Sequence, residues 1–133
     1  MKILIDTNCL MVAIPKQSPY RWLYDAIKQG DFTLAVSTDI LSEYEEQLGR
    51  FYSPELAENV LKLLINIPKL EKVDLYFNWN LITNDADDNK FVDCAIACGA
   101  DYIITHDKHF RILKDVLFPK VNCLSIDEFK ELL

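Results

Sequence analysis

The sequence has fewer basic residues than a simple nucleic-acid-coating protein would need. Its 133 residues include 14 lysines and arginines against 21 aspartates and glutamates, for a formal net charge of −7. Proteins that coat nucleic acid through its phosphates are basic, so this balance argues against that class. It suits a protein that gathers carboxylates around a metal ion, or one with a basic partner.

Two further absences exclude a membrane span and a zinc site. No apolar run approaches the roughly 20 residues that a spanning helix needs, and the amino terminus reads directly as a strand, without a signal-peptide pattern. We therefore expect a cytoplasmic protein that does not enter a membrane. The cysteines form no Cys-x-x-Cys pair and have no histidine at ligand spacing. In a reducing compartment we expect all four to be small buried apolar residues, namely Cys9, Cys94, Cys98 and Cys123.

What the sequence does contain is a regular alternation of strand-like and helix-like segments. Short apolar runs predict strands at 2–5, 32–36, 69–75, 101–105 and 120–124. Cap residues and apolar side chains at helical spacing predict the helices between and after them. Their starts are expected at Ser18-Pro19, Ser37 or Thr38, Ser53-Pro54, Asn84 to Asp88, Asp107 and Ser125.

This alternation predicts the fold class. Strands that alternate with helices form a parallel sheet with helices on both faces, joined by right-handed crossovers. The chain has no linker, repeat or low-complexity segment. We therefore expect one domain over residues 1–133, with three α/β/α layers around a central, mainly parallel sheet of four to five strands.

Acidic residues follow two of the predicted strands. Asp6 comes directly after the first strand, and Asp107 comes shortly after the strand that ends at Thr105. Parallel strands point the same way, so both acids should lie at one edge of the sheet, where open α/β sheets bind ligands. Taken alone, Asp6 could equally be a cap of a turn or a helix.

A second group of acids precedes the helix near residue 90. At about 100° per residue, Asp88 lies in line with the apolar stripe that faces the core, so it needs a partner or a metal ion. Asp93 points well away from that stripe, and we expect it to be solvated. Asp85 and Asp87 are weaker candidates because either could stabilise the start of the helix through its dipole.

A third group of acids lies on the helix that begins near Ser37. Glu46 falls opposite the apolar face and should be solvated, whereas Glu43 and Glu45 both flank that face. The helical wheel does not separate these two. Glu43 lies nearer the amino end of the helix, and therefore nearer the carboxyl edge of the preceding strand, which favours it.

Carboxylates that converge on one edge would repel and raise each other's pKa values unless a cation neutralised them. A set of oxygen ligands without cysteine or histidine suits Mg²⁺ or Mn²⁺. Such a site can lower the pKa of bound water and stabilise charge during phosphodiester cleavage. No covalent nucleophile is then required.

Taken together and in order, these segments resemble the PIN domain family, nucleases named after the PilT amino terminus. The resemblance covers essentially the whole chain and is nearest to the branch of VapC-like toxins from toxin–antitoxin pairs. It rests on the order of the motifs, since no single motif is specific. The motifs are Asp6-Thr7-Asn8 after a strand, Glu43 on the second helix, Asp85-x-Asp87-Asp88-Asn89-Lys90-Phe91 before a helix ending at Gly99, and Tyr102-Ile103-Ile104-Thr105-His106-Asp107.

The resemblance implies a function and a set of site residues. The implied activity is cleavage of RNA by an endoribonuclease that depends on Mg²⁺ or Mn²⁺. The implied partners are the RNA substrate, a small antitoxin protein and, because many relatives pair, a second copy of the chain. The acidic, metal-holding tetrad falls on Asp6, Glu43, Asp88 and Asp107. Assisting positions near the metal fall on Thr7, Asn8 and Thr105, with Asp85 as an extra acid.

Local bases and aromatic residues could supply the RNA contacts that the net charge does not. The bases near the motif acids are Lys90, Lys108, His109, Arg111 and Lys114, and His106 could also contact phosphate. Aromatic side chains that could stack on bases are Tyr20, Trp22, Tyr76 and Trp79, although the helical stripe makes a core role the stronger interpretation for Trp22.

Two alternatives remain open at this stage. One is a phosphate-handling α/β hydrolase that uses Asp6 as its nucleophile. That chemistry commonly has a second acid two residues later, where this chain has Asn8. The other is a non-catalytic module that keeps the PIN fold for binding or regulation.

Overall fold

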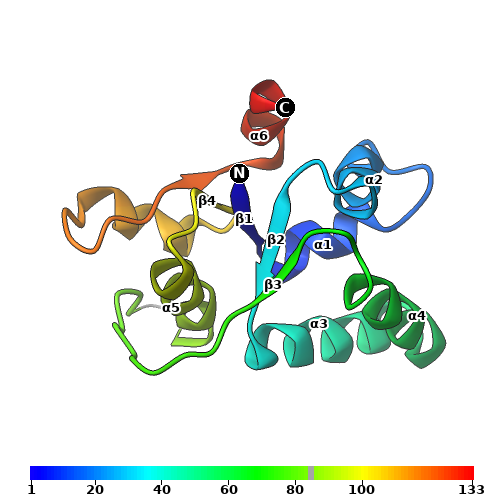
Figure 1. The fold of residues 1–133 in the computed structure, drawn as a ribbon, viewed down its shortest axis with the longest axis horizontal. Helices are drawn as coiled ribbons and strands as arrows, with labels where there is room; N and C mark the ends of the chain where they lie inside the picture. Colours follow the sequence, from blue (N-terminus) through cyan, green and yellow to red (C-terminus); the bar gives the residue numbers. More distant parts are fainter. Residues whose placement is uncertain (84–85) are drawn as a thin grey trace.

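The chain folds around a five-stranded sheet in which every strand is parallel to its neighbours (Figure 1). The structure is a computed structural model, and it describes residues 1–83 and 86–133. The strands follow the predicted apolar runs but are shorter than several of them. They are β1 (Lys2–Ile5), β2 (Thr33–Val36), β3 (Leu70–Lys72), β4 (Tyr102–Ile104) and β5 (Cys123–Leu124).

The order of the strands in the sheet is β3-β2-β1-β4-β5. From β1 the chain first adds β2 and β3 on one side, and then returns to add β4 and β5 on the other. The register pairs Ile3 with Tyr102 and Ile5 with Ile104. The strand order therefore reverses between β1 and β4, and in open α/β sheets the crevice at the carboxyl ends of such strands is where ligands bind.

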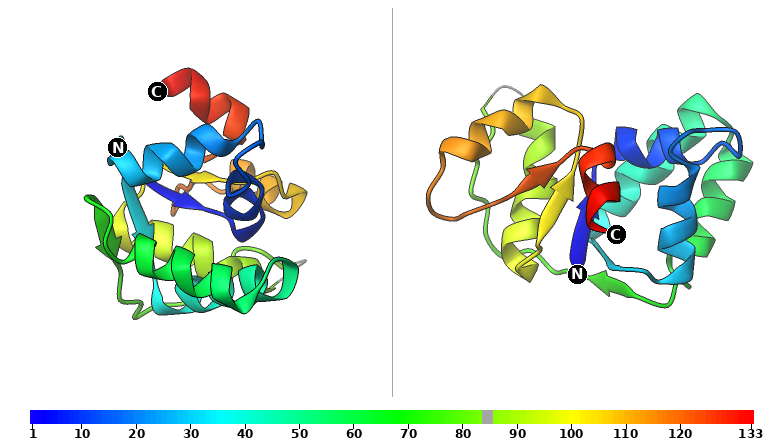
Figure 2. Two further views of the ribbon diagram at one scale, coloured as in Figure 1. Left: turned by 90° about the vertical axis from the view of Figure 1, so that its right-hand side faces the viewer. Right: turned by 90° about the horizontal axis from the view of Figure 1, so that it is seen from above.

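Helices cover both faces of this sheet, which confirms the three-layer fold class. Figure 2 shows α2 and α6 on one face and α3, α4 and α5 on the other. The helices are α1 (Thr7–Ala13), α2 (Arg21–Gln29), α3 (Thr38–Phe51), α4 (Pro54–Leu64), α5 (Asn89–Cys98) and α6 (Ile126–Leu132). Two 3₁₀ segments, η1 (Ala86–Asp88) and η2 (Lys108–Asp115), complete the described elements.

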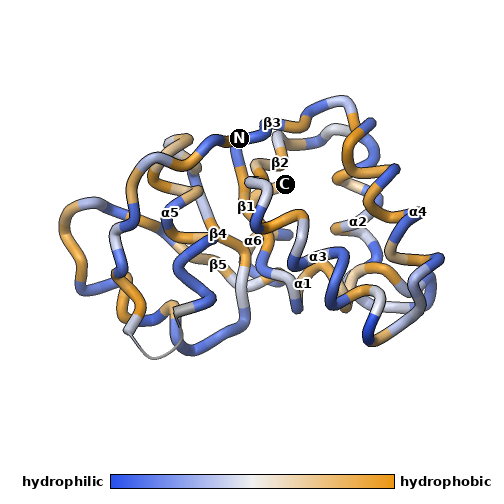
Figure 3. Tube along the Cα trace, turned by 90° about the horizontal axis from the view of Figure 1, so that it is seen from below, coloured by the Kyte–Doolittle hydropathy of each residue, from blue (hydrophilic) through white to orange (hydrophobic). Residues whose placement is uncertain are grey.

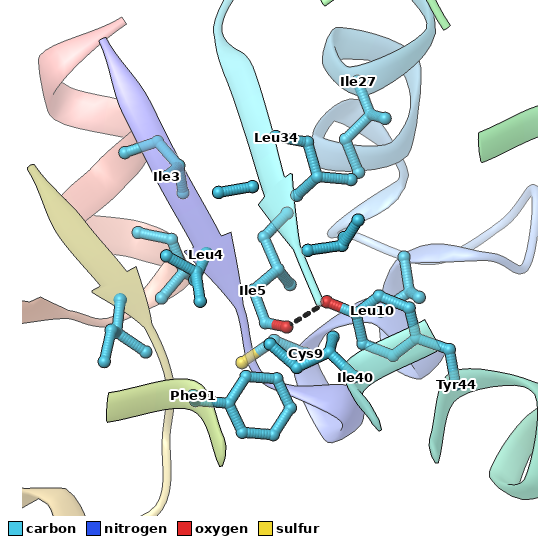
Figure 4. Close-up of a cluster of buried hydrophobic side chains, with 14 of the residues drawn as sticks. Ile3, Leu4, Ile5, Cys9, Leu10, Ile27, Leu34, Ile40, Tyr44 and Phe91 are labelled. Atoms are coloured by element: carbon cyan, nitrogen blue, oxygen red, sulfur yellow. Dashed lines mark hydrogen bonds between the residues drawn. The ribbon is translucent and has the colours of Figure 1, made fainter. Parts of the chain in front are cut away.

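The core is centred on β1, whose last three residues are fully buried. Figure 4 shows Ile3, Leu4 and Ile5 among apolar side chains from β2, α1, α2, α3 and α5. Along the trace in Figure 3, the apolar colour runs through the central strands, whereas the helices alternate between apolar and polar residues. Burying each of these three aliphatic side chains contributes about 1.5–3 kcal/mol. This packing makes β1 a rigid support for the residue that follows it.

Several helix ends form at the predicted cap residues. Ser37 and Ser53 each accept a hydrogen bond from a backbone N–H in the first turn of α3 and α4. Ser125 does the same for α6, and the Ser125 amide donates a hydrogen bond to the Glu128 carboxylate, which completes a capping box. Gly30 and Gly99 follow α2 and α5 with positive φ, a conformation that glycine adopts without strain.

Other predictions were wrong in detail. The helix expected from Ser18-Pro19 begins only at Arg21, because the Ser18 hydroxyl accepts a hydrogen bond from the Tyr20 amide and forms a turn instead. Helix α1 was not predicted at all. Its seven residues lie directly after β1, where the motif Asp6-Thr7-Asn8 drew attention to polar chemistry rather than to helix formation.

Two predictions about burial also need correction. Asp93 is buried rather than solvated, because its carboxylate accepts a hydrogen bond from the Trp79 amide at 3.0 Å and so anchors the long loop before η1. Among the cysteines, Cys9 and Cys94 are buried as expected, whereas Cys98 and Cys123 are only half-buried. Among the described residues, no helix is long and apolar enough to cross a membrane.

Candidate active site at the carboxyl edge of the sheet

Asp6 lies at the carboxyl end of β1, at the point where the strand order reverses. Its amide donates to the Ile104 carbonyl at 2.9 Å, which extends the β1–β4 pairing by one residue. The residue is only 5% exposed, and its Oδ2 accepts a hydrogen bond from the Thr105 hydroxyl at 2.9 Å. Although Asp6 occupies the N-cap position of α1, its carboxylate makes no capping hydrogen bond. The structure therefore does not favour the capping interpretation.

The electrostatics of Asp6 are unusual for a carboxylate. Burial raises its pKa to about 6, and the negative charges of Asp107 and Glu43 add to the rise. Hydrogen bonds from the Thr105 hydroxyl and the Thr7 amide act in the opposite direction but are outweighed. A buried acid with other acids around it is the pattern expected where a cation belongs.

Asp107 is joined to Asp6 through Thr105. The Asp107 amide donates to the Thr105 hydroxyl oxygen at 3.0 Å, and that hydroxyl in turn donates to Asp6. The Asp107 carboxylate accepts a hydrogen bond from the His109 amide at 2.9 Å and so caps η2. One threonine side chain thus fixes the spacing of two acids that follow adjacent strands. The assisting role that the family resemblance implied for Thr105 stays a prediction.

Glu43 reaches the same edge from α3. Its side chain is 21% exposed, and its Oε2 accepts a hydrogen bond from the Thr7 hydroxyl. Its other oxygen lies 2.8 Å from Lys90 Nζ. Glu45, which the helical wheel could not separate from Glu43, is exposed and lies in a cleft between α3 and α4. The structure therefore turns Glu43, and not Glu45, toward the other acids.

Lys90 balances the charge of Glu43. Burial alone would lower the pKa of Lys90, but the hydrogen bond and the charge of Glu43 outweigh that effect and raise it. Lys90 is in the first turn of α5, two residues after Asp88. The ammonium group of Lys90 thus lies at the side of the acidic site, where it can stay paired with Glu43 or contact a substrate phosphate.

Asp88 lies at the start of α5, at the head of the apolar stripe, as the sequence predicted. It is buried, and its Oδ2 lies 3.4 Å from Nδ1 of His109. The same nitrogen lies 3.3 Å from Oδ1 of Asp107. The ligand atoms of Asp88, Asp107 and His109 all fall within 4.8 Å of one another. The arrangement forms a donor set of two carboxylates and one imidazole.

Histidine 109 is the residue of this set that the sequence did not identify as a ligand. Sequence reasoning assigned it only a contact with phosphate and expected a short helix after Asp107. In the structure η2 is a 3₁₀ segment, and its first turn brings the imidazole back over Asp107. The short Asp107-x-His109 spacing is the signal that could have indicated this contact.

The remaining predicted positions are distributed as follows. Asn8 is exposed and lines a small cavity of about 190 Å³ that also borders Asp6 and Asp107. Asp85 lies outside the described residues, and Asp87 is exposed. His106 does not point into the acidic set: its Nε2 accepts a hydrogen bond from the Ile126 amide at 3.2 Å.

A cleft with basic side chains opens beside Asp107. Its volume is about 260 Å³, and Arg111 and Lys114 from η2 line it together with Asp107. Local positive charge therefore borders the acids even though the chain as a whole is acidic.

The aromatic residues predicted to stack on bases differ in exposure. Trp22 packs against the core, where its ring centroid lies 6.2 Å from that of Phe129. Tyr76 is 92% exposed.

The residues present fit a divalent cation. Four acidic side chains reach one edge of the sheet, and burial together with the charges of Asp107 and Glu43 raises the pKa of Asp6, an effect that a bound cation would oppose. Carboxylate oxygens are the ligands that Mg²⁺ and Mn²⁺ prefer. Hydrogen bonds from Thr7, Thr105 and the His109 amide hold three of the acids in place, which is the supporting arrangement that metal ligands need.

Comparisons with known proteins agree with this architecture. Two of the similar solved structures are VapBC complexes. The complex of VapBC2 from Rickettsia felis, bound to a DNA fragment from its promoter, aligns over 94% of this chain and 98% of that chain, with 19% identity and a TM-score of 0.64. VapBC-1 from nontypeable Haemophilus influenzae aligns over 96% and 99%, with 18% identity and a TM-score of 0.61.

A third similar structure is the PIN domain of T. brucei RRP44, which covers 97% of this chain and 78% of that one, with 12% identity and a TM-score of 0.55. At these identities the likeness shows the fold alone. No curated protein sequence matches the chain. The model of one family, described as the PIN domain, matches residues 2–109 and so includes all four acids of the site. The chain therefore belongs to the PIN domain family.

Proposed function

We propose that this protein is a metal-dependent endoribonuclease that hydrolyses phosphodiester bonds of RNA. The observation that carries the proposal is the convergence of acids on one sheet edge. Asp6 and Asp107 are linked through the Thr105 hydroxyl, the carboxylates of Asp88 and Asp107 both lie near His109 Nδ1, and Glu43 contributes its charge from α3. A structural role for any one of these acids would not account for the position of the other three.

In this proposal Asp6, Glu43, Asp88 and Asp107 would hold Mg²⁺ or Mn²⁺. The ion would supply a water of lowered pKa and neutralise charge that develops on the phosphate. The chain's own residues do the positioning. Thr105 ties the Asp6 carboxylate to the backbone of Asp107, and Thr7 orients Glu43. Arg111 and Lys114, which line the neighbouring cleft, would bind the phosphates of the RNA strand.

We further propose that the protein is the toxin of a toxin–antitoxin pair. Two of the similar solved structures are complexes named VapBC, and each aligns over more than nine-tenths of this chain. A small antitoxin protein would then be the partner that holds the nuclease inactive. A gene for a small DNA-binding protein next to the gene for this chain would support this part of the proposal.

The test is cleavage of defined RNAs by the purified chain with Mn²⁺ or Mg²⁺, and with EDTA. We expect cleavage by the native protein and a loss of at least about a hundredfold in Asp6→Asn and in Glu43→Gln. Glu45→Gln is the matched control, because this exposed residue lies on the same helix. It should cleave as the native chain does.

Other outcomes separate the alternatives. Cleavage that persists in Asp6→Asn, in preparations free of contaminating nuclease, would refute the proposal. If the native chain binds no Mn²⁺ and cleaves no RNA, the non-catalytic binding module becomes the better account. A phosphoryl group or fluoroberyllate trapped on Asp6 would instead support the phosphate-handling hydrolase.

A further inference from the structure

His109 is the residue of the acidic site whose position the family motif does not explain. Its Nδ1 atom is buried, and across residues 1–83 and 86–133 it has no hydrogen-bond partner. Yet this nitrogen lies 3.3 Å from an oxygen of Asp107 and 3.4 Å from an oxygen of Asp88. A buried imidazole nitrogen between two carboxylates, without a hydrogen bond of acceptable geometry, calls for a physical explanation.

We propose that His109 is a nitrogen ligand of the cation and that it makes the site prefer Mn²⁺ to Mg²⁺. The proposal rests on the nuclease site proposed above and adds one ligand to it. The ligand atoms of Asp88, Asp107 and His109 already lie within 4.8 Å of one another. In octahedral coordination with bonds near 2.1 Å, adjacent ligand atoms lie about 3.0 Å apart, so only small movements are needed to close these three atoms around an ion.

The local backbone holds the imidazole in this place. The His109 amide donates to the Asp107 carboxylate at 2.9 Å, so one residue both orients an acid and carries the imidazole. The side chain is 29% exposed, and its neighbour Phe110 is buried in the core. His109 is thus tied on one side to a ligand and on the other to the core, as a ligand on a rigid element should be.

The identity of the ligand atom determines which ion is favoured. Mg²⁺ is a hard cation that binds oxygen, whereas imidazole nitrogen suits transition metals. Of the two ions that the carboxylates could hold, Mn²⁺ is the transition metal. A mixed set of two carboxylates and one imidazole should therefore increase the affinity for Mn²⁺ and leave that for Mg²⁺ almost unchanged.

The test uses the full chain without a histidine tag, loaded with Mn²⁺ in a buffer that contains no nitrogen. Pulsed electron paramagnetic resonance detects ¹⁴N coupled to bound Mn²⁺. The chain has two histidines, which makes the assignment simple. We expect nitrogen coupling in the native protein and no coupling in His109→Gln. His106→Gln is the control and should keep the coupling, because the His106 side chain accepts a hydrogen bond from the Ile126 amide. Bound Mn²⁺ without nitrogen coupling in the native protein would overturn the inference.

Affinities give a second readout that does not depend on activity. By calorimetry we expect His109→Gln to lower the affinity for Mn²⁺ by about tenfold or more and that for Mg²⁺ by less than about twofold. Equal losses for both ions would show that His109 acts on the acids alone and would refute the proposed selectivity. Asp88→Asn distinguishes this failure from failure of the whole site: if Mn²⁺ binding is unchanged in that variant, the proposed metal site itself is wrong.

Discussion

Replacing Asp6 with asparagine should make the metal-free protein more stable. The same substitution should abolish the proposed activity. The carboxylate is buried, and its pKa rises to about 6 because burial disfavours the charged form and because Asp107 and Glu43 repel it. An asparagine is nearly the same size and carries no charge. It also keeps an oxygen that can accept the hydrogen bond from Thr105.

The magnitude follows from the pKa. A rise from 3.8 in the unfolded chain to about 6 in the folded protein means that, at neutral pH, the ionised Asp6 costs about 3 kcal/mol of folding free energy. The sign is fixed by the direction of the shift. The cost is absent below the unfolded pKa, grows as the pH rises from 3.8 to about 6, and is complete above that range. Asp6→Asn removes it.

Urea denaturation in EDTA at several pH values measures this effect. At pH 7.5 we expect the free energy of unfolding of Asp6→Asn to exceed that of the native protein by about 2–3 kcal/mol. For a domain of this size, that difference corresponds to a melting temperature higher by about 10 °C. Near pH 3.5 the two proteins should be nearly equal in stability. Asp127→Asn, at an exposed position of α6, is the control and should change little. A variant that is less stable than the native protein at pH 7.5, or a difference that does not depend on pH, would refute the reasoning.

Three further predictions concern stability at residues outside the four acids of the site. Tyr44→Phe removes the buried hydroxyl that donates to the Ile5 carbonyl, a hydrogen bond drawn as a dashed line in Figure 4. This change should lower the free energy of unfolding by about 1–2 kcal/mol in urea titrations. An unchanged unfolding midpoint would show that this hydrogen bond contributes nothing. Asp93→Ala leaves the Trp79 amide without its acceptor, which should lower the free energy of unfolding by about 1–2 kcal/mol. It should also change the tryptophan fluorescence of the native state, and an identical spectrum would contradict the anchoring role. Ser53→Ala removes the N-cap of α4 and should cost about 1 kcal/mol by thermal denaturation, with Ser53→Asp as the variant that should retain native stability.

The sequence predicted much of the fold because its strongest signals are local. Ser53 and Pro54 specify the start of a helix within two residues, and Gly99 specifies an end, because these residues act on the backbone beside them. Helix α1 escaped prediction since its seven residues follow a strand without a break. Asp93 was misjudged because its burial comes from a loop residue 14 positions away, which a helical wheel does not contain.

The site shows the same division between local and distant information. That Asp6 and Asp107 share an edge follows from the direction of parallel strands, and the structure agrees. The hydrogen bond from Thr105 to Asp6 joins residues 99 positions apart and depends on β1 and β4 being neighbours. The contact of His109 with Asp88 depends on the 3₁₀ geometry of η2, and no periodicity in the sequence specifies that geometry. The metal-holding roles of the four acids stay predictions.

The pairing of β1 with β4 has a consequence for when the protein can act. Asp6 directly follows the first strand, but β4, the neighbour of β1 that precedes Thr105 and Asp107, is made only after about a hundred residues have been synthesised. A chain that has been synthesised only as far as β3 contains Asp6 and Glu43 but not Thr105 or Asp107. A growing chain therefore lacks part of the acidic site until residue 107 has been added, so the proposed activity requires that most of the chain has already been made.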